Sequence, residues 1–218
     1  MSSTNQNEIA LESLHPCLRN WLAEKGWTEL RPIQTHAILH LGSSDFENSP
    51  SDVLLSAPTA GGKTMGALLP LLQRHLKRNA EGASADGFSI LYISPLKALI
   101  RQQADRQREI ADLARIVADA SGAPFSVRPW SGDVSDSVKK SAWQTPSGML
   151  LITPESIEGR LLNDPIGLVR VLRPLDAIVI DELHAYFGSV RGRHLISLLA
   201  RLDTLRGSAR PPFRLGLS

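Results

Sequence analysis

A short loop in the sequence has the residue types that could hold phosphate groups. The stretch VLLSAPTAGGKTMG, residues 53–66, passes from an apolar run to small residues and ends in Gly-Gly-Lys-Thr where a helical pattern begins. Small residues let a backbone close around phosphates, and a helix N-terminus offers N–H groups and a positive dipole end. Lys63 would reach the β- and γ-phosphates, and the hydroxyl of Thr64 would hold Mg²⁺. The alternative is a plain turn with a surface lysine, which the flanking strand and helix disfavour.

The candidate nucleotide-binding residues of this loop form one continuous run. They are Ala57, Pro58, Thr59, Ala60, Gly61, Gly62, Lys63 and Thr64. The usual pattern opens with glycine, a place that Ala57 takes here. We expect this run to bind ATP, and we expect Lys63 to be catalytic because its charge would act on the phosphate that is transferred.

A second segment, DAIVIDELHAYFG, places two carboxylates directly after a run of buried aliphatic residues. Mg²⁺ favours a carboxylate that acts largely through its water shell, and Asp181 suits this role. Glu182 is placed to orient or deprotonate an attacking water. Two acids that merely stabilise a helix start through its dipole are the alternative. The segment therefore predicts a metal residue and a catalytic residue at the sheet edge where the phosphate loop lies.

The bulk composition sets limits on the class of protein. The chain has 218 residues, 42% of them hydrophobic, and a formal net charge of +2, which is too mild to indicate nucleic acid by itself. Cys17 is the only cysteine, so an internal disulfide is impossible and a reducing cytosol is expected. The N-terminus lacks a signal peptide, and no apolar stretch approaches the roughly 20 residues of a membrane span. We expect a cytoplasmic protein without a membrane partner.

The order of the expected elements indicates the fold class. We expect helices at 14–26, 31–42, 63–78, 154–162 and 194–205, a long helix after residue 94, a loop at 43–52, and strands at 53–57, 88–94, 125–130, 148–153, 176–181 and 213–218. Strands that are apolar on both faces and alternate with helices are typical of an α/β fold with a mostly parallel central sheet and helices on both faces. Ligands of such folds bind at the carboxyl ends of the strands.

The two ATP motifs, with further segments between them in order, resemble the first RecA-like domain of superfamily 2 helicases of the DEAD/DEAH type, and more closely the large helicase-related (Lhr) group. The likeness runs from about Leu14 to Ser218. It implies a RecA-like P-loop NTPase domain at 31–218, preceded by an N-terminal helical segment at 1–30. RPIQ resembles the Q motif, which implies that Gln34 reads the adenine edge. DELH resembles motif II, which implies that His184 links the ATP site to motif III and to a second RecA-like domain.

The same resemblance implies a set of nucleic-acid contacts. SPLKAL, WSGD, ITPES and RGRHL resemble segments that meet nucleic acid in this family. The residues implied are Pro95, Leu96, Lys97, Arg101, Gly132, Asp133, Thr153, Pro154, Glu155 and Arg191. LGLS at the end resembles the start of motif III, and nothing resembles motifs IV to VI. We therefore expect the second RecA-like domain, with its arginine finger, to be absent from this chain.

For several residues, a packing or surface position is an alternative to a functional role. His36 and His40 have metal-ligand spacing but no third ligand in view, so packing or surface is favoured. Trp130 could stack on a base or belong to the core. Arg101 could track a phosphate backbone or lie on a solvated helix face. From Arg191 to Arg214 there are six arginines against one acid, Asp203, and a solvated surface is favoured over a binding site.

These observations leave two classes of function open. The first is an ATP-dependent nucleic-acid motor that uses ATP and Mg²⁺, with single-stranded DNA preferred as the partner and RNA possible. The second is a P-loop ATPase that uses ATP as a regulatory or assembly signal without translocation. Stimulation of ATP hydrolysis by single-stranded nucleic acid distinguishes the two.

Overall fold

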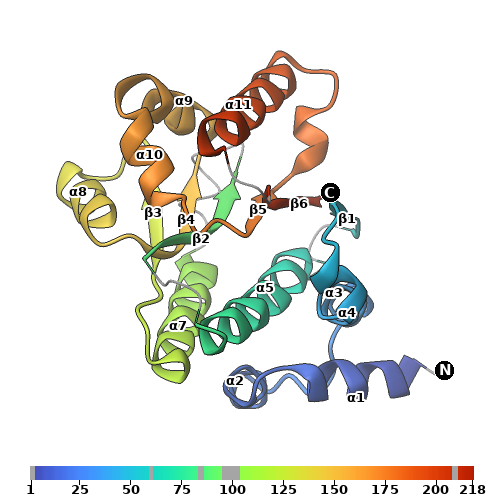
Figure 1. The fold of residues 1–218 in the computed structure, drawn as a ribbon. Coiled ribbons are helices and arrows are strands. Elements are labelled where there is room, and N and C mark those ends of the chain that lie inside the picture. The colour runs from blue at the N-terminus through green and yellow to red at the C-terminus, as the bar shows by residue number, and fades with distance from the viewer. Residues whose placement is uncertain (1–2, 59–60, 83–85, 95–103, 208–210) are drawn as a thin grey trace.

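The structure, a computed structural model, describes residues 3–58, 61–82, 86–94, 104–207 and 211–218 (Figure 1). Its helices are α1 (Ser3–Ser13), α2 (Pro16–Glu24), α3 (Pro32–Leu41), α4 (Ser44–Asn48), α5 (Lys63–Ala80), α7 (Ala104–Ser121), α8 (Asp136–Gln144), α9 (Pro154–Asn163), α10 (Pro165–Val171), the 3-10 helix η1 (Leu183–Tyr186) and α11 (Val190–Arg206). Its strands are β1 (Val53–Leu55), β2 (Gly87–Ile93), β3 (Val127–Trp130), β4 (Ser147–Ile152), β5 (Ala177–Ile180) and β6 (Phe213–Leu217).

The strands form one six-stranded sheet in the order β1-β6-β5-β2-β4-β3. Each pair of neighbouring strands in it runs parallel. All carboxyl ends of the strands therefore meet at one edge, which we call the carboxyl edge, and all amino ends meet at the opposite amino edge. The expectation of a parallel α/β sheet is confirmed.

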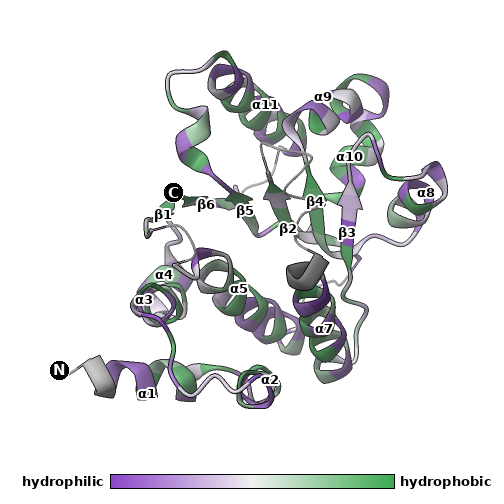
Figure 2. Cartoon of the chain, turned by 180° about the vertical axis from the view of Figure 1, so that it is seen from behind, coloured by the Kyte–Doolittle hydropathy of each residue, from purple (hydrophilic) through white to green (hydrophobic). Residues whose placement is uncertain are grey.

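Helices cover both faces of the sheet, as Figure 1 shows. Along β2 the side chains alternate: Ile90 belongs to the cluster formed with α3, α5 and α7, whereas Leu91 belongs to the cluster formed with α9, α10 and α11. Figure 2 shows the central strands mostly in the hydrophobic colour, while the helices carry both colours. Strands buried on both faces explain why their sequences read as continuous apolar runs.

The N-terminal segment is helical, as expected, and contains one helix more than the sequence pattern indicated. The predicted helix at 14–26 is α2, and α1 precedes it. Leu18, Trp21 and Leu22 are buried in the same cluster as α5 and α7. The segment thus packs on the helices of one sheet face. Among the described residues, no helix combines the length and apolar character needed to cross a membrane.

The expected loop at 43–52 is wrong over half of its length, because it contains α4. Ser43 caps this helix by accepting the N–H of Phe46 at its Oγ, 3.3 Å away. Phe46 is buried against Phe213, with ring centroids 5.0 Å apart and the rings edge to face. A single buried aromatic anchors a helix that is too short for a periodic pattern to reveal.

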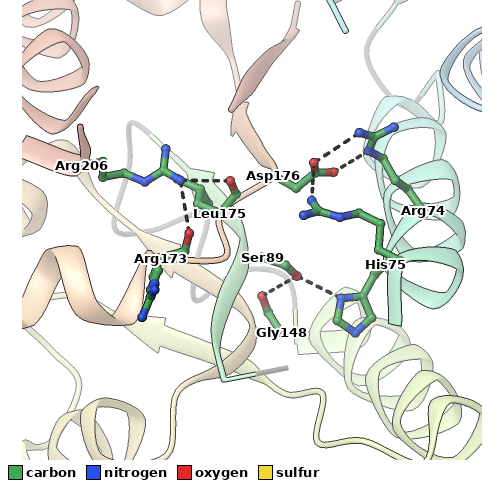
Figure 3. A network of polar contacts seen from close by, with 9 residues as sticks. Arg74, His75, Ser89, Gly148, Arg173, Leu175, Asp176 and Arg206 are labelled. Carbon is green, nitrogen blue, oxygen red and sulfur yellow. Dashed lines mark hydrogen bonds and ion pairs between the residues drawn. The ribbon is translucent and has the colours of Figure 1, made fainter. Parts of the chain in front are cut away.

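The arginine-rich end of the chain is tied into the fold. Arg201 donates to Glu158 at 2.9 Å, and Arg214 donates to Asp203 at 2.6 Å. Arg206 donates to the carbonyl oxygens of Leu172, Arg173 and Leu175, as Figure 3 shows in part. Arg201, Arg206 and Arg214 thus hold α11 against its neighbours, so internal contacts account for these three arginines of the charge run.

Candidate functional site

The candidate residues divide along the carboxyl edge according to the strand order. The phosphate loop follows β1, Ser218 follows β6, and Asp181 and Glu182 follow β5, and these three strands are neighbours. Of the segments that resemble nucleic-acid contacts, WSGD and ITPES begin at the carboxyl ends of β3 and β4, in the other half of the sheet, whereas RGRHL lies in the first turns of α11. The described ATP candidates and these two segments therefore lie along one edge.

The phosphate loop connects β1 to the N-terminus of α5, whose first residue is Lys63. Gly62 has φ 86°, and a Cβ there would lie 2.6 Å from Nε2 of Gln34. A Cβ on Gly61 would lie 2.7 Å from the carbonyl oxygen of Pro58, and the Gly61 N–H donates to that oxygen at 2.8 Å. Both glycines are therefore required by geometry. Thr59 and Ala60 lie outside the described residues.

Lys63 and Thr64 occupy the first turn of a helix of 18 residues. The Lys63 ammonium donates to the carbonyl oxygen of Ala57 at 2.6 Å, so it lies across the loop rather than in solvent. Thr64 is buried. The positive end of a long helix favours anions, and the ammonium adds a full charge at the same place. This arrangement is poorly explained by a plain turn with a surface lysine.

Gln34 contacts the phosphate loop through its side chain. Only 1% of the residue is exposed. Its Oε1 accepts the backbone N–H of Arg31 at 2.9 Å, and its Nε2 donates to the carbonyl oxygen of Gly62 at 3.3 Å. The amide therefore connects the start of α3 to the loop, and its implied contact with adenine stays a prediction.

Asp181 is buried at the end of β5, with 7% of the residue exposed. Its Oδ2 accepts the hydroxyl of Tyr92 at 2.7 Å, and its Oδ1 accepts the backbone N–H of Glu182 at 2.9 Å. A carboxylate in such a place needs donors to replace the water it loses. These two hydrogen bonds hold the orientation of the carboxylate.

Glu182 is the one non-glycine residue with positive φ in the described part of the chain, at φ 49° and ψ 45°. This left-handed conformation is uncommon for a glutamate and occurs disproportionately at functional sites. The helix that follows, η1, has only 4 residues. Stabilisation of a helix dipole is therefore a weak explanation for the two acids.

His184 contacts both Glu182, which follows β5, and Ser218, which follows β6. Its Nε2 lies 3.4 Å from Oε2 of Glu182, and its Nδ1 lies 3.4 Å from Oγ of Ser218. The carbonyl oxygen of Ser218 accepts the N–H of Ala57 at 3.1 Å. A chain of contacts thus runs from Glu182 through His184 and Ser218 to the phosphate loop.

The predicted nucleic-acid residues differ in burial, and some lie outside the described residues. Pro95, Leu96, Lys97 and Arg101 lie outside the described residues. Gly132 and Asp133 are exposed in the turn after β3. Thr153 and Pro154 are buried, and Thr153 caps α9 by accepting the Ser156 N–H at 3.3 Å.

The hydroxyl of Thr153 is thus used at the start of α9, and its implied contact with nucleic acid stays a prediction. Glu155 and Arg191 are exposed and form an ion pair at 3.1 Å between α9 and α11. Trp130 is buried under the guanidinium of Arg160, whose Cζ lies 4.6 Å from its ring centroid. The core interpretation of Trp130 is therefore confirmed.

The two metal candidates of the sequence analysis, Thr64 and Asp181, both offer oxygen atoms. Within the described ranges, no group of three histidine, cysteine or acidic residues could hold a metal ion. His36 and His40 are both exposed on α3, in agreement with their interpretation as surface residues. The sequence analysis missed Tyr92. The one signal for it is a phenol in the mostly apolar strand FSILYIS, two residues before the predicted SPLKAL contact segment.

Comparisons with known proteins agree with this geometry. The family model for DEAD/DEAH box helicases matches residues 31–218. The "ATP-dependent helicase Lhr-Core protein 2" of Thermococcus barophilus is 32% identical over 217 residues, which cover 97% of this chain and 24% of that protein. The "Lhr helicase/uracil glycosylase" of Escherichia coli is 31% identical over 93% of this chain and 13% of its own length. The chain thus spans about a quarter or less of these relatives.

Solved structures show the same fold. The helicase Lhr of Mycobacterium smegmatis, bound to ssDNA and AMP-PNP, has a TM-score of 0.73 and 29% identity, covering 96% of this chain and 25% of that one. The protein Mss116p, bound to ssRNA and AMP-PNP, has a TM-score of 0.78 at 19% identity and covers 95% of this chain and 38% of that one. The second likeness concerns the fold alone. The RecA-like fold expected from the sequence is thereby confirmed.

Proposed function

We propose, because the chain belongs to the DEAD/DEAH box helicase family, that it is the ATP-binding half of an ATP-dependent nucleic-acid helicase of the Lhr-like group. The observation that carries the proposal is the neighbourhood of β1, β6 and β5 in the sheet. This order brings Lys63, Asp181 and Glu182 to one part of the carboxyl edge, although the sequence separates them widely. Phosphate, metal and water would each find a residue there.

In this proposal, each group of the site has a role in the hydrolysis of ATP. Backbone N–H groups of the loop and the α5 dipole would bind the phosphates, and the Lys63 ammonium would neutralise charge that develops on the γ-phosphoryl group. The Glu182 carboxylate would orient the attacking water and accept its proton. His184 would couple conformational changes at this site to Ser218, because their side chains are in contact. The proposal assigns Gln34 to the adenine edge and to the loop.

The residues fit Mg²⁺ by the chemistry of their donor atoms. Thr64 supplies a hydroxyl oxygen and Asp181 a carboxylate oxygen, and both are hard ligands. Mg²⁺ typically uses few protein ligands and keeps several waters, so two such oxygens are enough to hold it. When bound, the ion would neutralise charge between the phosphates. Thr64 and Asp181 would hold it there.

The nucleic-acid half of the carboxyl edge would bind a single strand. DNA is the preferred partner in this proposal, because the structurally similar Lhr of Mycobacterium smegmatis is bound to ssDNA. An RNA strand is the alternative partner. A second RecA-like domain, in keeping with the greater length of the relatives, would supply an arginine finger and the other wall of the cleft. The cytoplasm is the proposed location.

The test is steady-state ATP hydrolysis by the full-length protein with and without single-stranded DNA. We expect DNA to stimulate turnover and Lys63→Ala to abolish it. Lys77→Ala is the matched control, because Lys77 lies near the other end of α5 and pairs with Glu47 on the surface. ATP hydrolysis that depends on Lys63 but ignores both DNA and RNA would instead favour a P-loop ATPase with a regulatory role. Turnover that survives Lys63→Ala would contradict both.

A further inference from the structure

Tyr92 is a polar side chain in the middle of the sheet, and its hydroxyl contacts the candidate metal residue. It lies on β2 next to β5, where Tyr92 is in register with Val179. From there its hydroxyl donates to Oδ2 of Asp181 at 2.7 Å, and 7% of each residue is exposed. The length is that of a charge-assisted hydrogen bond. The contact is therefore short, buried and directed at a carboxylate.

The hydrogen bond determines how the carboxylate of Asp181 is presented. Tyr92 holds Oδ2, while the backbone N–H of Glu182 holds Oδ1 at 2.9 Å. Rotation about the Cβ–Cγ bond would break both of these bonds. A carboxylate oxygen can accept more than one hydrogen bond, so a bond from Tyr92 is compatible with a contact to a metal-bound water. Orientation of a metal-binding carboxylate by a residue that does not itself touch the ion is a general feature of metal sites.

We propose that Tyr92 is a positioning residue for Mg²⁺, which holds the carboxylate of Asp181 in the orientation that the ion's water shell needs. The inference rests on the proposed function, because it takes Asp181 to be the metal residue. It adds a residue from β2 to a site whose other parts follow β1 and β5. In this inference Tyr92 acts on the ion through its hydrogen bond to Asp181.

A purely structural role would give Tyr92 a different signature. If the phenol only satisfied two buried polar groups, its loss would lower stability and leave the requirement for metal unchanged. If it positions Asp181, its loss raises the Mg²⁺ concentration that nucleotide binding requires and leaves metal-free nucleotide binding unchanged. The two roles therefore separate in a metal titration.

The chain offers a matched control in its other tyrosine. The hydroxyl of Tyr186 is buried and has no hydrogen-bond partner in the described structure. Tyr92→Phe and Tyr186→Phe thus remove the same atom from two buried rings, and only the first removal breaks a contact with Asp181. Both changes preserve the ring and its packing.

The experiment is a Mg²⁺ titration of the binding of a fluorescent, non-hydrolysable ATP analogue, with a parallel titration in EDTA. For Tyr92→Phe we expect the half-saturating Mg²⁺ concentration to rise on the order of tenfold, with unchanged affinity in EDTA. Tyr186→Phe should match the wild type. In an Asp181→Asn background, Tyr92→Phe should have no further effect on the metal requirement.

Two results would overturn the inference, and they are distinguishable. An unchanged Mg²⁺ requirement in Tyr92→Phe, with a wild type that depends on Mg²⁺ and on Asp181, would overturn the role of Tyr92 and leave the proposed function intact. A wild type that binds the analogue without regard to Mg²⁺ or to Asp181 would overturn the assignment of Asp181, and with it both proposals.

Discussion

The two edges of the same sheet differ in how their polar groups are used. At the amino edge, Asp176 accepts Nε of Arg74 at 2.5 Å and also pairs with Arg78, while Nδ1 of His75 lies 3.1 Å from Oγ of Ser89 (Figure 3). At the carboxyl edge, His184 is largely exposed and its contacts with Glu182 and Ser218 are both 3.4 Å long.

One sheet thus has a stabilising role at its amino edge and, in the proposed function, a chemical role at its carboxyl edge. The charged groups at the amino edge pair with one another and hold a helix to a strand, while Nε2 of His75 is buried without a hydrogen-bond partner in the described structure. At the carboxyl edge, to which the proposed function assigns phosphate, metal and water, Glu182 adopts a backbone conformation that stability alone would not favour. Changes at the carboxyl edge should therefore alter chemistry, and changes at the amino edge should alter stability.

Replacing Glu182 tests the carboxyl edge most strongly. Glu182→Gln should retain ATP binding but lower turnover by roughly 10²–10⁴-fold, because an amide cannot accept the proton of the attacking water. Turnover and nucleotide affinity are measured on the same preparation. An unchanged kcat would remove Glu182 from the catalytic role.

Replacing Asp176 tests the amino edge. Asp176→Asn leaves Arg74 and Arg78 without their buried counter-charge, which should lower the free energy of unfolding by about 3–5 kcal/mol. Asp112→Asn is the matched control, because Asp112 pairs with Lys25 at 3.3 Å on the surface and should cost at most about 1 kcal/mol. Urea unfolding measures both. Equal losses in the two variants would contradict the special role of the amino edge.

A change at Gln34 should have an intermediate effect, because this residue contacts the phosphate loop and is implied in adenine recognition. Gln34→Ala removes the bond from Nε2 to Gly62 and should weaken ATP binding by about 1–3 kcal/mol, with a smaller preference for ATP over GTP. Competition binding of the two nucleotides measures this. If the wild type binds ATP and GTP equally, Gln34 stabilises the phosphate loop and does not recognise adenine.

The smallest effect concerns the pH dependence of stability at the amino edge. Burial, with a smaller contribution from the charge of Arg78, lowers the pKa of His75 to about 4 against an opposing effect of Asp176. The unfolded chain, with an imidazole pKa of about 6.5, takes up a proton first as pH falls. The contribution of neutral His75 is therefore complete above about pH 6.5 and is lost progressively toward pH 4.

The check compares urea unfolding of the wild type and His75→Gln at pH 7.5 and pH 5. Glutamine does not titrate in this range, so the variant should lose about 1–2 kcal/mol less than the wild type between the two pH values. Parallel losses would show that His75 does not titrate with the fold.

Sequence patterns predicted the parts of the site that are contiguous in the chain. The phosphate loop and the two acids after β5 each combine residue type with a flanking strand, so local rules were sufficient. The parallel sheet then followed from apolar runs alternating with helices. The sequence could not show that Tyr92 meets Asp181, because these residues are 89 positions apart and the contact depends on β2 lying beside β5.

Other features were beyond sequence reasoning for related physical reasons. The left-handed backbone of Glu182 has no residue signature, since glycine would be the expected residue there. The nucleic-acid contact implied for Thr153 stays a prediction, and the sequence analysis did not foresee that its hydroxyl caps α9. The short helix α4 depends on one aromatic anchor rather than on a periodic pattern.

The central claim, that this chain is one half of a nucleic-acid motor, is tested most directly by ATP hydrolysis of a protein that consists of residues 1–218, beside the full-length protein. Without an arginine finger, turnover by residues 1–218 should be slower by about 10³–10⁵-fold. It should depend on Lys63 and should not respond to single-stranded DNA. Robust DNA-stimulated turnover by residues 1–218 that is abolished by Lys63→Ala would contradict the claim.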